Sequence, residues 1–469
     1  IICLVREKLF KNFHNFYLDI LPDVFFLNKN DFTIIMYKNQ DFPHNKYVMI
    51  MKKKDLLELL LNATCTFTCT NYLKNILLKE NFKEVKETEI WHLKEGKYFV
   101  TRNDASLIAF TIPKKSTHFQ IITTHNDTPS LLLKPKGENI SENYLSVNIM
   151  PYGGLLNYGW LDHPLSLAGR VYIKKNNKIK KKIIDLNETV AVVPSVAIHL
   201  NDKANSNLDL NMQTDLQPIL GISEKVLDFE KFLKEKLNLS QEEKLIDYDL
   251  FLYNNEKPSF LGMNDELLLS PRIDNITSVS ASFYAFLNAT SLEHINLFCT
   301  FNHEEIGSLT KEGAESDFLI DTLKRICASL NMDIASSLAK SFIISSDNTH
   351  AVHPNHTEYK DKTGNVYLNK GFAIIKEVSS TTDASFSSLL KNLCEKKKIA
   401  YQNATLKNDL TGGSTLSSLS LRQVSVNSID VGIGELAMHS SLEVCSFKDY
   451  ETLYKMMKCF YNTSFKEIV

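Results

Sequence analysis

Four apolar, strand-like segments of this chain each end in histidine or carboxylate residues, and this pattern restricts the fold more than any other feature. The segments are 119–124, 295–301, 342–345 and 428–433. The polar residues that follow them are His125 and Asp127, then His303, Glu304 and Glu305, then Asp347 and His350, and finally His439 in a later loop. In open α/β sheets, ligands bind beyond the carboxyl ends of the strands. The sequence therefore predicts one site at one sheet edge, although each residue alone is typical of an ordinary loop.

Helical and strand-like segments alternate along most of the chain, which indicates an α/β fold. Helices are predicted at about 54–62, 70–81, 276–289, 316–331, 384–397 and 448–462, and further strands around Trp91 and at 98–101, 106–111 and 399–405. Residues 131–257 differ, because short β-like runs at 144–149, 167–173, 183–186 and 190–193 are separated by turns. We expect the lysines at 178–182 to cap a solvated hairpin. The pattern predicts an α/β domain formed by 51–130 and 258–469, with 131–257 as a β-rich insert.

Composition excludes two classes of function. Lys plus Arg is 53 against 55 for Asp plus Glu, a net charge of -2, so the chain lacks the positive field that nucleic-acid binding requires. No apolar run approaches the roughly 20 residues that cross a bilayer, so we expect no membrane partner.

The eight cysteines form no CxxC pair. Free, buried thiols in a reducing compartment are the expected state, which predicts a cytoplasmic protein.

Residues 1–50 do not have the pattern of the rest of the chain. They are rich in Phe and Tyr, and charges such as Arg6 and Lys8 interrupt the apolar residues, unlike in a signal peptide. An amphipathic helix begins just after Met51. We therefore expect an atypical N-terminal extension at 1–50 and a native start at Met51 or Met49. The alternative is a genuine arm that packs on a neighbour.

The polar residues at the strand ends are of the type that binds metal ions. Imidazole and carboxylate without thiolate suit zinc, manganese or cobalt. Two neighbouring ions need a bridging carboxylate, for which Asp274, just before a helix, is a candidate. Adjacent Glu304 and Glu305 cannot both face one pocket from a regular strand, so the chain must turn there, and Gly307 permits this. One Glu could then bind metal while the other moves protons, and Asp127 could orient His125.

Seven separated motifs resemble the aspartyl aminopeptidase family, in its bacterial type. They are HNDTP at 125–129, YGG at 152–154, Asp162 with LSLAGRV at 165–171, RIDN at 272–275, HEEIGS at 303–308, SDNTHAVHPN at 346–355 and AMHS at 437–440. Their order and rough spacing agree with the family from about Met51 to Phe460. So many motifs in one order make the resemblance specific.

The resemblance implies a fold, a metal centre and a reaction. The implied fold is a central mixed β-sheet flanked by helices, with an inserted β-rich dimerisation domain. The implied ligands are His125, Asp274 and Asp347 for one zinc ion, and Asp274, Glu305 and His439 for the other. Glu304 would be the general base and later acid, and Asp127 would support the first histidine. Members release Asp and Glu from peptide N-termini and assemble from dimers into dodecamers.

Some positions depart from the family pattern. Asn126 and Thr128 replace the usual Thr and Ser, and His163 and Pro164 are unusual in their run. The basic and aromatic segment expected before the late helix is absent, and the chain instead reads KEVSSTTD at 376–383. The complete set of metal-type residues therefore implies hydrolysis more strongly than it implies acid selectivity.

Three further residues are candidates for substrate binding. His350 resembles a family residue that contacts substrate, and Lys376 matches the position that supplies a cation. Lys376 could equally be an ordinary surface lysine. His199 either reaches a neighbouring subunit's active site or holds a local turn, and both interpretations remain open. The alternatives to an acid-specific enzyme are a metalloaminopeptidase of broader specificity, a dinuclear deacylase of small amides, and a non-catalytic shell or delivery protein of the same fold.

Overall fold

The computed structural model describes residues 24–29, 32–37, 44–206, 208–225, 229–290, 293–410, 420 and 422–465. The chain divides into two compact units, Ile1–Lys54 and Asp55–Val469. In the first unit, β1 (Val24–Lys29) and β2 (Phe32–Tyr37) pair in antiparallel fashion, and α2 (His44–Asn62) begins. The rest of the predicted extension at 1–50 lies outside the described residues.

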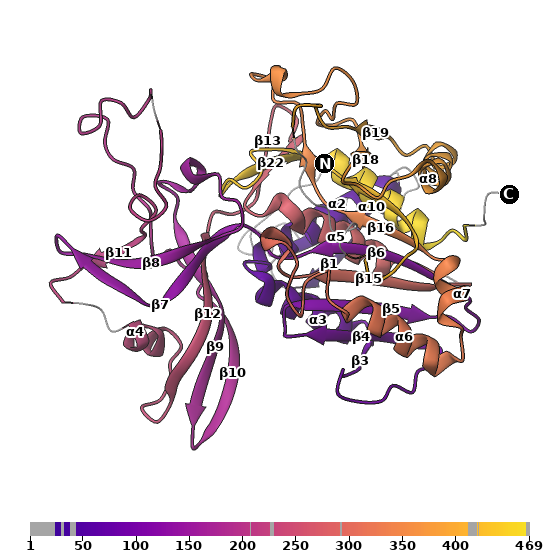
Figure 1. The fold of residues 1–469 in the computed structure, drawn as a ribbon, viewed down its shortest axis with the longest axis horizontal. Coiled ribbons are helices and arrows are strands. Elements are labelled where there is room, and N and C mark those ends of the chain that lie inside the picture. The colour runs from indigo at the N-terminus through magenta and orange to yellow at the C-terminus, as the bar shows by residue number, and fades with distance from the viewer. Residues whose placement is uncertain are drawn as a thin grey trace. The chain divides into compact units, whose positions relative to one another are not determined.

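A mixed sheet is the centre of the second unit (Figure 1). Its described strands run in the order β19 (Tyr401–Ala404), β18 (Phe372–Ile375), β20 (Asn427–Gly432), β16 (Phe342–Ser346), β6 (Phe119–His125), β15 (Ile295–Phe301), β5 (Ser106–Ile112), β4 (Gly96–Arg102) and β3 (Lys83–Glu84). Strand β6 is parallel to both of its neighbours, β16 and β15, and β16 is parallel to β20. The carboxyl ends of these four strands therefore share one edge, whereas β5 and β18 join their neighbours β15 and β20 in antiparallel fashion.

Side chains alternate along the strands of this sheet, so both of its faces carry apolar residues. Helices cover both faces. On β6, Ile122 belongs to one hydrophobic core and Ile121 to the other. The first core contains residues of α2, α3 (Thr66–Lys79), α5 (Ile273–Leu287), α8 (Ala384–Lys397) and α10 (Phe447–Tyr461), and the second those of α6 (Phe318–Leu330) and α7 (Ile334–Ala339). Fully buried side chains such as Phe298 each contribute about 2 kcal/mol. The predicted mixed sheet flanked by helices is confirmed.

A smaller sheet joins segments that are far apart in sequence. Its described strands run in the order β13 (Ser259–Leu261), β14 (Leu267–Ser270), β22 (Glu443–Ser446), β21 (Gly434–Leu436) and β17 (Thr349–His350). Strand β14 leads into α5, β17 follows β16, and β21 follows β20. This sheet therefore holds the segments around Asp274, Asp347 and His439 next to one another.

A third sheet, entirely antiparallel, lies within the predicted insert (Figure 1). Its described strands run in the order β10 (Lys178–Asp185), β9 (Leu165–Lys175), β12 (Lys244–Asn254), β7 (Ser130–Ser141), β8 (Tyr144–Tyr152) and β11 (Ile219–Ile222). The same segment contains the short helices η1 (Asn157–Trp160) and α4 (Phe229–Lys236), and it has a hydrophobic core of its own. Its limits at 131 and 257 and its role in dimers stay predictions.

Two local predictions are wrong. The lysines at 178–182 do not cap a turn but form most of β10, and the turn is at Asn176 and Asn177. Lysines on an edge strand oppose pairing with another chain, which explains their density there. No strand forms around Trp91, whose indole instead packs in the second core and donates to the Lys86 carbonyl at 2.9 Å.

The sequence predicts no membrane-spanning segment and free cysteines, and the described residues bear on both predictions. None of the described helices is long and apolar enough to cross a membrane. The seven described cysteines are all free, and every one except Cys459 is buried. The predicted free, mostly buried thiols are therefore confirmed for these residues.

We expect a chain that starts at Met51 to fold and to keep the hydrolytic activity implied by the resemblance. It retains Leu56, Leu59 and Leu60 of α2, which are fully buried and contribute about 2 kcal/mol each. A chain that starts at Cys65 loses all three and should unfold at a much lower temperature. Thermal unfolding of both, beside the full chain, is the measurement. An insoluble or inactive Met51 chain would show that the extension is structural.

Candidate active site

Residues from five segments meet beyond the shared edge of the central sheet. His125 ends β6, Asp347 follows β16, and Asp274 lies at the kinked start of α5. Glu305 lies in η2 (Glu304–Ile306), just after β15, and His439 follows β21. The structure thus brings together most of the metal-type residues that the sequence placed at strand ends. His303 is not among them, because its Nδ1 contacts the Thr310 hydroxyl instead.

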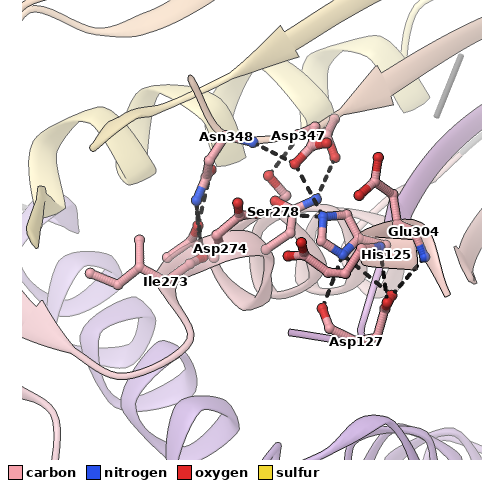
Figure 2. A network of polar contacts seen from close by, with 12 residues as sticks. His125, Asp127, Ile273, Asp274, Ser278, Glu304, Asp347 and Asn348 are labelled. Carbon is pink, nitrogen blue, oxygen red and sulfur yellow. Dashed lines mark hydrogen bonds and ion pairs between the residues drawn. The ribbon is translucent and has the colours of Figure 1, made fainter. Parts of the chain in front are cut away.

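One group of possible ligands surrounds the buried imidazole of His125 (Figure 2). Its Nε2 lies 3.2 Å from Asp347 Oδ1 and 3.4 Å from Asp274 Oδ1. Its Nδ1 contacts the backbone oxygen of Asp127 at 3.0 Å. A proton on Nδ1 would be donated to that oxygen, which leaves the Nε2 lone pair directed at the carboxylates. His125, Asp274 and Asp347 therefore form a triplet of oxygen and nitrogen donors, all within 4.8 Å of one another.

A second group shares one member with the first. His439 Nε2 lies 3.6 Å from Asp274 Oδ2 and 3.4 Å from Glu305 Oε2. Its Nδ1 lies 2.8 Å from the carbonyl oxygen of Gly154, which fixes the ring as Asp127 fixes that of His125. Because Asp274 turns one oxygen toward each histidine, its carboxylate lies between the two groups.

The donor set fits metal ions. Asp274 Oδ1 and Glu305 Oε1 are buried and have no hydrogen-bond partner among the described residues. Burial of an unpaired carboxylate is costly unless a cation offsets its charge. Histidine nitrogen and carboxylate oxygen, with no thiolate, are donors that zinc accepts. A third combination within 4.8 Å, of His125, Glu304 and Glu305, shows that Glu304 faces the same space.

The protonation of the site reflects its excess of negative charge. Burial raises the pKa of Glu304 to about 8, and the nearby Asp347, Asp127 and Asp274 add to this rise while His125 opposes it. Burial opposes protonation of His439, but its hydrogen bond with Asp274 and the charges of Glu305 and Asp274 raise its pKa to about 10. Protons thus offset part of the negative charge. Bound metal would displace them, so its affinity should fall as pH falls.

Asp127 connects His125 with the turn that carries the two glutamates. Its carboxylate accepts the backbone N–H of Glu304 at 3.2 Å, the N–H of Glu305 at 3.1 Å and the hydroxyl of Tyr152 at 2.7 Å. Oδ1 also lies 3.5 Å from His125 Nδ1. Although burial favours its neutral form, the hydrogen bond and charge of His125, together with the Tyr152 hydroxyl, keep the pKa of Asp127 below its usual value. The ionised side chain therefore holds the glutamate turn in place, as Figure 2 shows.

The turn allows both adjacent glutamates to face the site. His303 has φ 66° and Gly307 has φ 95°, and between them η2 replaces the alternation of a strand. A side chain other than glycine would be strained at Gly307. The prediction that the strand ends here, with Gly307 permitting the turn, is confirmed.

Two residues that support the ligands were missed as site residues in the sequence. Glu443 accepts backbone N–H groups of Asp274 and His439, and Asn348 donates its side-chain amide to the Ile273 carbonyl at 3.0 Å. Asn348 lies beside Asp347 in the motif SDNTHAVHPN at 346–355. The only signal for Glu443 was an acidic residue within an otherwise apolar segment four positions after His439.

The three candidate substrate-binding residues lack contacts like those that connect the ligand groups. His350 is exposed on β17, and its backbone oxygen accepts from Lys360 Nζ at 2.7 Å. Lys376 is exposed just after β18, and His199 is exposed in the insert. Within the described residues, no hydrogen bond or ion pair joins the side chain of Lys376 or His199 to the ligand groups. Their predicted roles remain predictions.

The chain resembles known aminopeptidases over most of its length. The profile of the family described as aminopeptidase I zinc metalloprotease (M18) matches residues 59–461. A probable M18 family aminopeptidase 2 of Clostridium novyi is 38% identical over 424 residues, which cover 87% of this chain and 98% of the relative. These matches define the class of the protein as a metalloaminopeptidase, a hydrolase of the zinc-dependent type. The chain belongs to the M18 family, and the predicted relationship to these aminopeptidases is confirmed.

Solved structures agree with this fold. A chain in the cryo-EM structure of the Ape4 and Nbr1 complex has a TM-score of 0.85 at 30% identity, covering 90% of this chain and 87% of its own. The S. cerevisiae mApe1 dodecamer has a TM-score of 0.77 at 24% identity, covering 88% and 97%. At that identity the second likeness shows the fold alone.

Replacing Asp127 with Asn should weaken both the fold and the activity. The amide has one acceptor oxygen, so at least one buried N–H in the glutamate turn loses its partner, at a cost of about 2 kcal/mol. We expect kcat to fall at least about 10-fold because the turn is misplaced. Tyr152→Phe is the matched control, since it removes one donor and leaves the carboxylate intact. Asp127→Asn with a normal kcat would contradict the orienting role.

Proposed function

We propose that this chain removes the N-terminal residue from peptides at a site of two metal ions, with a preference for Asp and Glu. His125, Asp274 and Asp347 would hold one ion, and Asp274, Glu305 and His439 the other. The observation that carries the proposal is the carboxylate of Asp274, which lies between two histidine-containing triplets. A carboxylate in that position can bridge two ions. Zinc is the proposed metal, with manganese or cobalt as substitutes.

The residues around the ligands support proton transfer during hydrolysis. Bound metal ions would supply Lewis acidity, which polarises the scissile carbonyl and makes water more acidic. Glu304 accepts the proton of the attacking water and returns it to the leaving amine. Its carboxylate faces the space shared by the ligand groups, where it can take a proton from water and release it again. Asp127 orients Glu304 through its backbone N–H.

The acidic preference depends on a different part of the chain. Recognition of a substrate carboxylate requires a cation or strong donors in the pocket. We propose that Lys376 supplies the charge and that His350 contacts the substrate. Lys360 is a second cation beside His350, because it is half-buried and its Nζ donates to the His350 backbone oxygen. Since Lys376 is exposed, a metalloaminopeptidase of broader specificity is the second candidate function.

Assembly is proposed because the family resemblance implies it, and a chain of the same fold forms a solved dodecamer. In the insert, apolar side chains such as Val196, Leu200 and Ile222 are exposed, with Leu200 84% and Ile222 81% accessible. Val196 and Leu200 lie within five residues of each other, and apolar side chains that are exposed together are typical of a protein interface. We propose that 131–257 forms dimers that assemble into a dodecamer, and that His199 extends to a neighbouring subunit. Peptides are the proposed substrates.

Replacing Glu304 with Gln should abolish turnover without loss of metal. The change removes the proton acceptor and not a ligand, so kcat should fall by about 10²- to 10⁴-fold while zinc content stays near that of the wild type. Glu305→Gln is the matched control on the adjacent residue, and it should lose metal as well as activity. Hydrolysis of an Asp-linked chromogenic amide and elemental analysis measure the two effects. Near-normal turnover of Glu304→Gln would refute the assignment.

Replacing Lys376 with Met should reduce kcat/KM for Asp- and Glu-amides and leave that for Leu-amides unchanged. A lost charge contact with a carboxylate costs about 1.5 to 3 kcal/mol, or roughly 10- to 150-fold in kcat/KM. Lys370→Met, an exposed lysine before the same strand, is the control. Acid selectivity that survives in Lys376→Met but disappears in Lys360→Met would assign the role to Lys360. A wild-type enzyme without selectivity would support the broader function.

A further inference from the structure

Glu443 is a buried carboxylate whose two oxygens contact two different ligand segments. It begins β22 and is 2% exposed. Its Oε2 accepts the backbone N–H of Asp274 at 3.1 Å, and its Oε1 accepts the backbone N–H of His439 at 2.8 Å. One side chain therefore spans the two residues whose side chains face each other at 3.6 Å.

The sheet places Glu443 between these segments. Strand β22 pairs with β14 on one side, where Glu443 is opposite Ser270, and with β21 on the other. Strand β14 leads to Asp274, and β21 leads to His439. The carboxylate thus belongs to the first residue of the strand that separates the two ligand segments.

Neither ligand residue is held by regular secondary structure. Asp274 has φ −79° and ψ 112°, outside the helical region although α5 has begun, and His439 has φ 66°. Their N–H groups therefore depend on an acceptor from elsewhere. Glu443 is that acceptor for both.

We propose that Glu443 is a positioning residue that fixes the separation of Asp274 and His439. In this way it sets the affinity of the second ligand group for its metal ion. The inference rests on the ligand set under the proposed function. Each N–H here contacts a different oxygen of Glu443, and an amide in its place would have only one acceptor oxygen. Replacing a residue that hydrogen-bonds to a metal ligand commonly lowers metal affinity about 10- to 100-fold.

The test is Glu443→Gln in the full chain, titrated with zinc after chelation. We expect the second ion, for which both Asp274 and His439 lose their positioning, to bind about 10- to 100-fold more weakly. The first ion shares only Asp274, so its affinity should fall less. Thermal unfolding is measured with and without zinc. A merely structural role lowers Tm equally in both conditions, whereas a positioning role lowers the zinc-dependent part of the Tm.

Asp449→Asn is the matched control. Asp449 is a fully buried carboxylate on α10 that accepts the N–H groups of Asn369 at 2.7 Å and Gly371 at 2.6 Å. Neither donor belongs to a ligand residue, so this variant should lose stability equally with and without zinc. It removes the same kind of double acceptor from a place without metal chemistry.

The possible results separate this inference from the proposed function. Normal second-ion affinity in Glu443→Gln, or a loss no greater than in Asp449→Asn, would overturn the inference alone. If Glu443→Gln does not fold, Glu443→Asp replaces it, because a shorter arm cannot reach both donors. Normal zinc titration of that variant overturns the inference too. A wild-type chain that binds fewer than two ions, or whose His439→Ala variant keeps both, would overturn the proposed function and the inference together.

Discussion

Several carboxylates are buried together at one edge of the central sheet, and the structure around them must offset and hold this negative charge. The side chains of Asp127, Asp274 and Glu305 are almost inaccessible and lie around the equally buried His125, and Glu304 and Asp347 face the same space. Such a cluster is unfavourable unless protons or cations offset it. A left-handed residue at each end of the glutamate turn and the small sheet behind the ligands both serve to hold these groups together.

The residues proposed for hydrolysis and those proposed for acid selectivity lie in different parts of the molecule. The groups proposed for hydrolysis are linked by hydrogen bonds and ion pairs through Asp127, Asp274 and Glu443. The groups proposed for acid recognition, Lys376 and His350, are exposed and outside this network. The site could therefore keep its chemistry while its preference for the first residue of a peptide changes.

The sequence predicted the layers of the fold and the main residues that the structure brings together at the sheet edge, because both depend on local patterns. An apolar run that ends in His125 or Glu304 carries its own signal, and α8 lies where its periodicity predicted it. The lysines of β10 were misplaced, because an edge strand and a solvated turn are equally polar in sequence. Glu443 was missed because its role depends on pairing between β14, β22 and β21, which no local pattern reveals.

The most direct test of the central claim is a crystal structure of the full chain with zinc, measured by anomalous scattering at the zinc edge. We expect two peaks, one near His125 and Asp347 and the other near Glu305 and His439, with the Asp274 carboxylate between them. We also expect that Glu304 is not a ligand of either ion. A single peak, or a zinc ion bound by Glu304 in place of Glu305, would contradict this expectation.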